Sequence, residues 1–232
     1  MFVDRFLQFL TNLIGYCFSI DIYLGDYDRT SFPVDCVKDK CTKNWKVHPD
    51  MIIKHHDYNS KTISNDIALL RLEKKAPLSV LKVEVMSSIK FFSDDGSPSH
   101  SVVGWGMTEN SHTSNVLLTT ELSMIPKNQC PSDVPEKHLC AGDAKGKDTC
   151  PGDSGGPLIM YHNNKYYLSG IVSYGPDVKC GTSKMGYYTN VYNISLKPQV
   201  KLKLKGNVTN HSNTSVRAVN DTKTIFLATD IK

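Results

Sequence analysis

The sequence lacks a long uninterrupted apolar run. The apolar stretch at the start of the chain, residues 1–20, is interrupted by Gln8, Thr11 and Asn12 and is too short to span a bilayer. Paired Cys-x-x-Cys spacing, a Gly-rich phosphate loop, a dinucleotide fingerprint and a base-reading element are also missing. We therefore expect no cofactor, no structural metal, no nucleic-acid partner and no stable membrane insertion.

The composition is that of an ordinary globular protein. Of 232 residues, 40% are apolar and 22% are charged, which excludes a collagen, a coiled coil or a fully disordered chain. Short β-branched runs are repeatedly cut by turn residues, which favours an all-β fold. The net charge of +4 belongs to the end of the chain, since residues 195–232 hold seven Lys or Arg and two Asp. This leaves 20 basic and 21 acidic residues before them, so the body of the chain has no basic surplus.

The seven cysteines are spaced for disulfide bonds rather than for a zinc site. Cys36 and Cys41 are local neighbours, Cys130 and Cys140 are a second local pair, and Cys150 and Cys180 flank a Gly-rich region. The odd cysteine, Cys17, stands apart in the apolar leader. Disulfides persist in oxidising compartments, so the six others predict a secreted protein.

Both ends differ in composition from the middle. Residues 1–20 are either a signal peptide or a leader that does not belong to the fold, because Asp4 cancels Arg5 and no clear cleavage site follows. Residues 194–232 form a basic tail that we expect to be disordered. Five Asn-x-Ser/Thr sequons begin at Asn193, Asn207, Asn210, Asn213 and Asn220. They indicate either exposure to glycosylation or simply a polar tail.

The hexapeptide Gly-Asp-Ser-Gly-Gly-Pro at residues 152–157 is the most informative segment. Glycines on both sides of the serine allow a sharp backbone turn that presents Ser154 Oγ on a bend. The amides of Gly152 and Ser154 would then point at a common position. This arrangement is typical of an oxyanion hole for acyl transfer.

A serine hydroxyl needs a base, usually a histidine that a carboxylate orients. Asp66 lies at the start of the apolar run Ile67–Leu72, where a buried carboxylate is costly unless it is hydrogen-bonded. Taken alone, Asp66 is equally well explained as a residue that caps the strand.

Beyond these motifs, the chain resembles the trypsin-like serine endopeptidases of the chymotrypsin fold, most of all their arthropod clip-domain branch. The resemblance follows the family's order over about three quarters of the chain. Its segments are residues 22–28, 65–72, 103–106, 139–142, 148–157, 173–175, 180–181 and 188–192. It implies a double β-barrel over residues 21–193, the nucleophile Ser154, the oxyanion donor Gly152 and the orienting acid Asp66.

The resemblance also implies a substrate pocket. Asp148 matches the acid at the pocket base, Gly175 and Gly186 match its walls, and Ser173, Tyr174 and Gly175 match the strand that pairs with substrate. A buried carboxylate selects a cation. The expected partners are thus a protein or peptide with Arg or Lys at the cleavage site, and an upstream activating protease or inhibitor. Asp148 could alternatively be an ordinary loop acid beside Lys145 and Lys147.

The departures from the family concern the start of the fold. No histidine precedes His48, although the resemblance places the catalytic imidazole upstream of Asp66, and none of the later histidines has motif support. No Ile-Val-Gly-Gly segment is present to supply the terminal amine that pairs with the acid matching Asp153. We expect a partial first barrel and an essentially complete second barrel. The function expected is an incomplete peptidase without its base, or a non-catalytic homologue that binds or regulates.

Overall fold

The structure is a computed structural model that describes residues 20–76, 83–85, 100–176, 178–192 and 224–227. The strands of the first half are β1 (Ile22–Leu24), β2 (Val34–Val37), β3 (Lys40–Lys43), β4 (Trp45–Val47), β5 (Pro49–Lys54), β6 (Ala68–Leu72) and β7 (Val83–Val85). Those of the second half are β8 (His100–Gly104), β9 (Leu118–Ile125), β10 (His138–Gly142), β11 (Pro157–His162), β12 (Lys165–Tyr174), β13 (Gly186–Asn190) and β14 (Thr224–Leu227). A single 3-10 turn, η4 (Lys127–Gln129), is the one helical element in these ranges, so the all-β prediction is confirmed.

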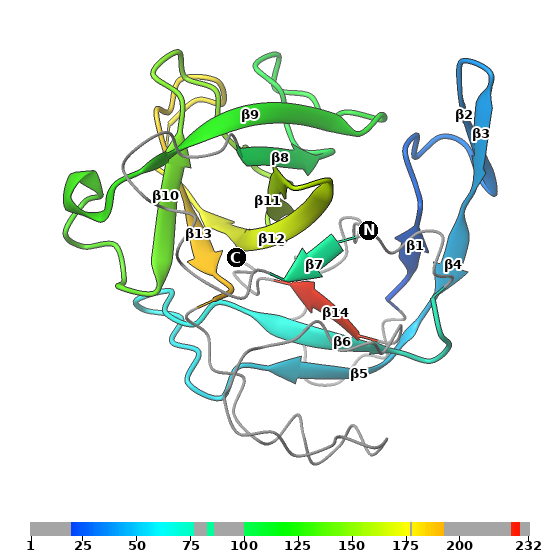
Figure 1. The fold of residues 1–232 in the computed structure, drawn as a ribbon, viewed down its shortest axis with the longest axis horizontal. Helices are drawn as coiled ribbons and strands as arrows, with labels where there is room; N and C mark the ends of the chain where they lie inside the picture. Colours follow the sequence, from blue (N-terminus) through cyan, green and yellow to red (C-terminus); the bar gives the residue numbers. More distant parts are fainter. Residues whose placement is uncertain (1–19, 77–82, 86–99, 177, 193–223, 228–232) are drawn as a thin grey trace.

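Six strands of the second half close into a barrel. Their order is β11-β8-β9-β10-β13-β12, and the barrel closes because β11 also pairs with β12. Alternate side chains point inward and form the core, which consists of Val102, Leu122, Ala141, Leu158, Val172 and Tyr188. Figure 1 shows this barrel in green to orange, with β7 added parallel to β12. The prediction of an essentially complete second barrel is confirmed.

The strands of the first half form separate sheets. β1 pairs with β4, β5 pairs with β6, and β2 pairs with β3 in a hairpin that projects from the body (Figure 1). Their apolar core contains Ile20, Ile22, Leu24, Val47, Leu70, Leu72 and Ala76. Among the described residues these strands do not close into a ring, which agrees with the predicted partial first barrel.

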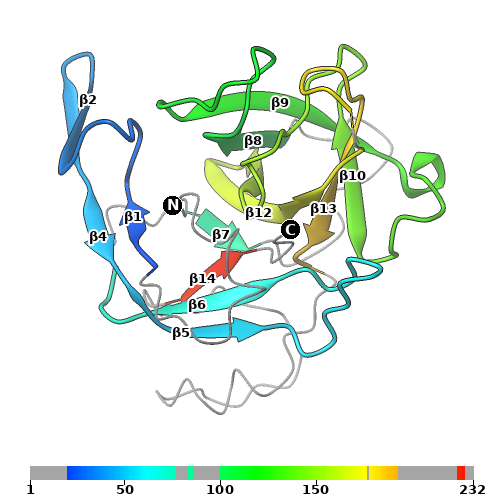
Figure 2. The same ribbon diagram turned by 180° about the vertical axis from the view of Figure 1, so that it is seen from behind.

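The chain ends lie largely outside the described residues. Within the predicted tail, Thr224–Leu227 form β14, which runs antiparallel beside β6 at the edge opposite β5 (Figure 2). These four residues of the tail thus form a strand beside the first sheets. The rest of the tail, its sequons, the leader and Cys17 lie outside the described ranges. No described segment forms a helix with the length and apolarity needed to cross a bilayer.

Candidate active site

The loop that carries Ser154 is tied to strand β12. The amide of Gly155 donates to the carbonyl of Val172 at 2.9 Å, and the amide of Val172 donates to the carbonyl of Gly156 at 2.8 Å. Gly152 and Gly155 have φ of 98° and 82°, a backbone conformation that glycine adopts without strain. Ser154 itself is exposed, so the loop presents its hydroxyl to solvent on a backbone that is tied to β12 immediately after it.

The side chain of Asp153 points the opposite way, into the protein. Its Oδ1 accepts a hydrogen bond from the amide of Gly106 at 2.8 Å, and its Oδ2 accepts one from Cys150 at 2.9 Å. Burial raises the pKa of Asp153, and these two hydrogen bonds oppose the rise. Gly104 and Gly106 pack so closely on the carboxylate that a Cβ at either position would overlap it. The half-buried carboxylate thus has two amide donors, and no cationic side chain pairs with it within the described ranges.

Asp66 is completely buried between the first sheets and the barrel. Its Oδ2 accepts a hydrogen bond from the hydroxyl of Ser173 at 2.6 Å, and its backbone carbonyl accepts one from the hydroxyl of Thr189 at 2.7 Å. Both donors belong to the barrel, on β12 and β13. Asp66 is therefore held by specific long-range contacts, which a residue that merely caps a strand does not need.

One stretch of β12 joins the nucleophile loop to the buried acid. Val172 bonds to Gly155, which follows Ser154, and the next residue, Ser173, bonds to Asp66. Tyr174 ends the strand, with its ring centroid 4.7 Å from that of Tyr187. Four residues predicted from separate motifs, Asp66, Ser154, Ser173 and Tyr174, are thus brought to one end of β12.

Asp148 lies beside β13, with neutral hydrogen-bond donors around it. Its Oδ1 accepts bonds from the amide of Thr149 at 2.7 Å and from the hydroxyl of Tyr188 at 3.3 Å. Burial raises its pKa and outweighs these hydrogen bonds. A Cβ on Gly186 would lie 2.5 Å from Oδ1, whereas one on Gly175 would meet no atom within 4 Å. The structure thus surrounds a half-buried acid with neutral groups, which is the electrostatic condition for binding a cation.

Three disulfide bonds brace these loops, as expected from the cysteine spacing. They join Cys36 to Cys41, Cys130 to Cys140 and Cys150 to Cys180. The third ties the segment before Ser154 to the loop after Gly175. The first closes the projecting hairpin of β2 and β3, where Asp35 accepts hydrogen bonds from Ser31, Tyr27 and Asp28.

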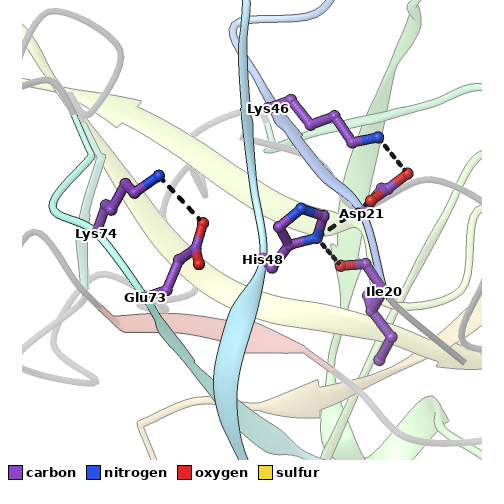
Figure 3. Close-up of polar contacts among 6 residues, drawn as sticks. All are labelled: Ile20, Asp21, Lys46, His48, Glu73 and Lys74. Atoms are coloured by element: carbon purple, nitrogen blue, oxygen red, sulfur yellow. Dashed lines mark hydrogen bonds and ion pairs between the residues drawn. The ribbon is translucent and has the colours of Figure 1, made fainter. Parts of the chain in front are cut away.

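None of the described histidines contacts the hydroxyl of Ser154. His48 lies between β4 and β5, where its Nδ1 is 3.2 Å from Asp21 Oδ1 and 3.1 Å from the carbonyl of Ile20 (Figure 3). Asp21 also pairs with Lys46 at 2.7 Å. His48 is thus engaged in a surface network of the first sheets.

The remaining described histidines have other surroundings. His100 is buried in β8, and His112 contacts the carbonyl of Asn110 on an exposed turn. The ring of His138 packs edge-on against Tyr174 at 5.6 Å, and burial, followed by the nearby charge of Lys127, lowers its pKa to about 4. His55 and His56 stack on each other beyond β5, and His162 is the last residue of β11. No imidazole reaches Ser154 from the described part of the chain, so the predicted nucleophile and the predicted acid have no base beside them among these residues.

Sequence reasoning missed the residues that hold the acids in place. Thr149 and Tyr188 bind Asp148, and Thr189 binds the backbone of Asp66. His138, which packs against the Tyr174 ring, was also missed. Apart from Thr149, these residues lie far from their partners along the chain. Thr149, Tyr188 and Thr189 fall in segments that carry the family resemblance, but the resemblance gave them no role.

Comparison with known proteins adds a consistent result. The Trypsin family profile matches residues 36–197. Melanization protease 1 of Drosophila melanogaster is 36% identical over 193 residues, which cover 73% of this chain and 48% of that protein. CLIP domain-containing serine protease HP8 of Bombyx mori is 35% identical over 190 residues, covering 73% and 50%. The chain thus spans about half the length of the curated relatives it matches.

Proposed function

The chain belongs to the trypsin family, and from this we propose that it is a trypsin-like serine endopeptidase, of which the present residues supply the nucleophile and the orienting acid but no catalytic histidine. Residues 21–193 would form the peptidase domain, with the leader outside it and β14 of the tail added as a strand beside β6. The substrate would be a protein or peptide cut after Arg or Lys in a secreted proteolytic system. Two relatives, named as a melanization protease and a clip-domain serine protease, support a role among proteases that act on other proteins.

The observation that carries this proposal is the link from Ser154 through β12 to Asp66. In the proposed reaction Ser154 Oγ attacks the substrate carbonyl carbon and its proton passes to a base, a role that no described histidine is placed to fill. The C–N bond of the substrate then breaks, and the amine leaves with that proton while the acyl group stays on Ser154. The amides of Gly152 and Ser154 would stabilise the negative charge that develops on the carbonyl oxygen. In the described residues neither amide donates a hydrogen bond to a protein group, so both are available for this role. The acyl-enzyme would then be hydrolysed by water.

Asp148 would select the substrate. A cation brought to a carboxylate surrounded by neutral groups forms a strong charge-assisted hydrogen bond. The open space beside Gly175 leaves room for a long Arg or Lys side chain. The backbone of Ser173, Tyr174 and Gly175 would pair with the extended substrate as a short antiparallel strand.

The missing base limits what the chain does by itself. Removing one member of a catalytic triad lowers kcat by about 10⁴–10⁶-fold, because the nucleophile then has no positioned proton acceptor. We expect the purified chain to react slowly with a fluorophosphonate probe and to turn over an Arg ester slowly, with both reactions abolished in Ser154→Ala. Labelling as fast as that of active trypsin would contradict the proposal.

A second candidate is a secreted, non-catalytic protease homologue that binds or regulates. The retained Asp148 pocket without a base favours it. Sequencing the transcript upstream of the codon for Asp21 separates the two functions. A coding segment with a family-type catalytic histidine would support the endopeptidase, and a transcript without one would support the homologue.

A further inference from the structure

The loop between β5 and β6 begins with three consecutive residues that can ligate a metal, His55, His56 and Asp57. One ligand atom from each lies within 4.8 Å of the others. His55 is buried, whereas the other two side chains are exposed. Sequence analysis assigned no metal to this chain, and the Asp148 and Ser154 sites do not use this loop. We propose that these three residues bind a zinc ion, and that the ion stiffens the loop that holds Asp66.

The spacing of the three groups suits a small divalent ion. Zinc bonds of about 2.0–2.2 Å in a tetrahedral site place neighbouring ligand atoms roughly 3.3 Å apart. His56 Nε2 and Asp57 Oδ2 are already 2.9 Å apart, and the rings of His55 and His56 stack with centroids 4.8 Å apart. Bringing all three ligand atoms to bonding distance of one ion therefore needs a rotation of exposed side chains and no movement of the core.

The chemistry of the ligand set favours zinc over calcium or magnesium. Two imidazoles and one carboxylate are ligands that zinc and its first-row neighbours accept, whereas calcium and magnesium prefer oxygen ligands alone. Three protein ligands leave a fourth position for water.

Binding would replace one existing hydrogen bond. The amide of Asp57 donates to His55 Nδ1 at 3.1 Å, which requires a free lone pair on that nitrogen. A neutral imidazole has one such lone pair, and a zinc ion on either nitrogen leaves Nδ1 unable to accept the amide proton. The Asp57 amide thus provides a direct signal for an ion on His55.

The cluster is attached to Asp66 from both sides. The amide of His55 donates to the carbonyl of Ile67 at 3.0 Å. The side-chain amide of Asn65 donates to the carbonyl of Asp57 at 3.0 Å. Ile67 and Asn65 are the two chain neighbours of Asp66, so an ion that orders residues 55–57 also restricts the backbone on each side of the buried acid.

Calorimetric titration of the full untagged chain with zinc chloride tests the site. We expect one zinc ion per chain, and a loss of at least about tenfold in affinity in both His56→Ala and Asp57→Asn, since even indirect partners of a metal site typically contribute about 10–100-fold. Both residues are exposed, so the variants should fold normally. His112→Ala, which removes an exposed histidine from another loop, should leave the affinity unchanged.

Amide NMR spectra recorded during the same titration provide the second measurement. Saturation with zinc should shift the Asp57 amide together with those of Asn65 and Ile67, and this change should disappear in His56→Ala. The proposal is overturned if zinc does not bind, if both variants bind it as tightly as the unaltered chain, or if the shifts fall outside this loop.

Discussion

The hydroxyl of Ser173 donates a 2.6 Å hydrogen bond to Oδ2 of Asp66, across 107 residues of sequence. Both side chains are buried, so the contact is shielded from water. It joins the sheets of the first half to the barrel at the point where the nucleophile loop also meets β12. A contact that anchors a buried carboxylate in this way serves the fold as well as the proposed chemistry.

Replacing Ser173 by alanine should therefore destabilise the fold. The carboxylate of Asp66 would lose a donor while it stays buried, and such a loss typically costs about 1–3 kcal/mol. Urea unfolding followed by tryptophan fluorescence measures the change. Ser132→Ala, at an exposed turn, should change the unfolding free energy by less than about 0.5 kcal/mol. Equal effects of the two substitutions would show that the buried contact contributes nothing.

Asp153 should make the fold less stable as pH rises. Burial raises its pKa above the ordinary value of 3.8, so the folded state binds the proton more tightly than the unfolded state. The stability from this group is fully present below pH 3.8 and is lost as pH rises through the folded pKa. Unfolding free energies from about pH 3 to about pH 7 should fall less steeply in Asp153→Asn than in the unaltered chain. Parallel curves would contradict the expectation.

Asp35 should have the opposite effect. Burial works against ionisation, but the hydrogen bonds from Ser31, Tyr27, Asn44 and Asp28 together lower its pKa from 3.8 to about 2. The stability from Asp35 is therefore present above pH 3.8 and is lost as pH falls through about 2. Asp35→Asn should be less stable than the unaltered chain at neutral pH, and the difference should shrink on acidification. A difference that stays constant down to pH 2 would mean that the charge of Asp35 is not involved.

Added imidazole should speed the acylation of Ser154 if the missing proton acceptor limits the reaction. A positioned base contributes about 10²–10⁴-fold, and a freely diffusing base should recover only part of this, roughly tenfold at high concentration. The measurement is the rate of fluorophosphonate labelling with and without imidazole. An N-methylated pyrrole of similar size, which cannot accept the proton, is the control. No acceleration by imidazole would argue for a site whose oxyanion hole or nucleophile loop is not competent.

The sequence predicts some parts of this site well and others poorly. The loop around Ser154 was recognisable because its positive-φ backbone requires glycine at residues 152 and 155. The residues that meet this requirement lie next to Ser154 in the sequence. The contacts that hold Asp66 and Asp148 were not recognisable. Ser173 was predicted as part of the strand that pairs with substrate and not as a donor to Asp66, and Thr189 and Tyr188 are ordinary strand residues until the barrel closes.

The same limit explains β14. Its four residues are a short β-branched and aromatic run inside a polar segment, and nothing local specifies a partner. Without β14, the edge of β6 opposite β5 would be unpaired, and β14 pairs with the backbone groups of that edge. A prediction of this pairing would have required knowing which edges the first half of the chain leaves open.

Substitutions at two glycines should distinguish the contribution of the proposed pocket to stability from its contribution to cation binding. Gly186→Ala should destabilise the fold by about 1–3 kcal/mol, because the new Cβ would lie 2.5 Å from Asp148 Oδ1 in a packed region. Gly175→Ala should leave the unfolding free energy nearly unchanged, because its Cβ would meet no atom within 4 Å. If that open space receives the substrate side chain, Gly175→Ala should nevertheless weaken the binding of benzamidine, a flat amidinium cation, by about tenfold or more, since a methyl group in a filled pocket costs about 1–3 kcal/mol. Calorimetry of the two variants, with Asp148→Asn as the variant that removes the pocket charge, measures both quantities. Unchanged benzamidine affinity in Gly175→Ala and Asp148→Asn would mean that Asp148 is an ordinary loop acid and that the cation does not bind there.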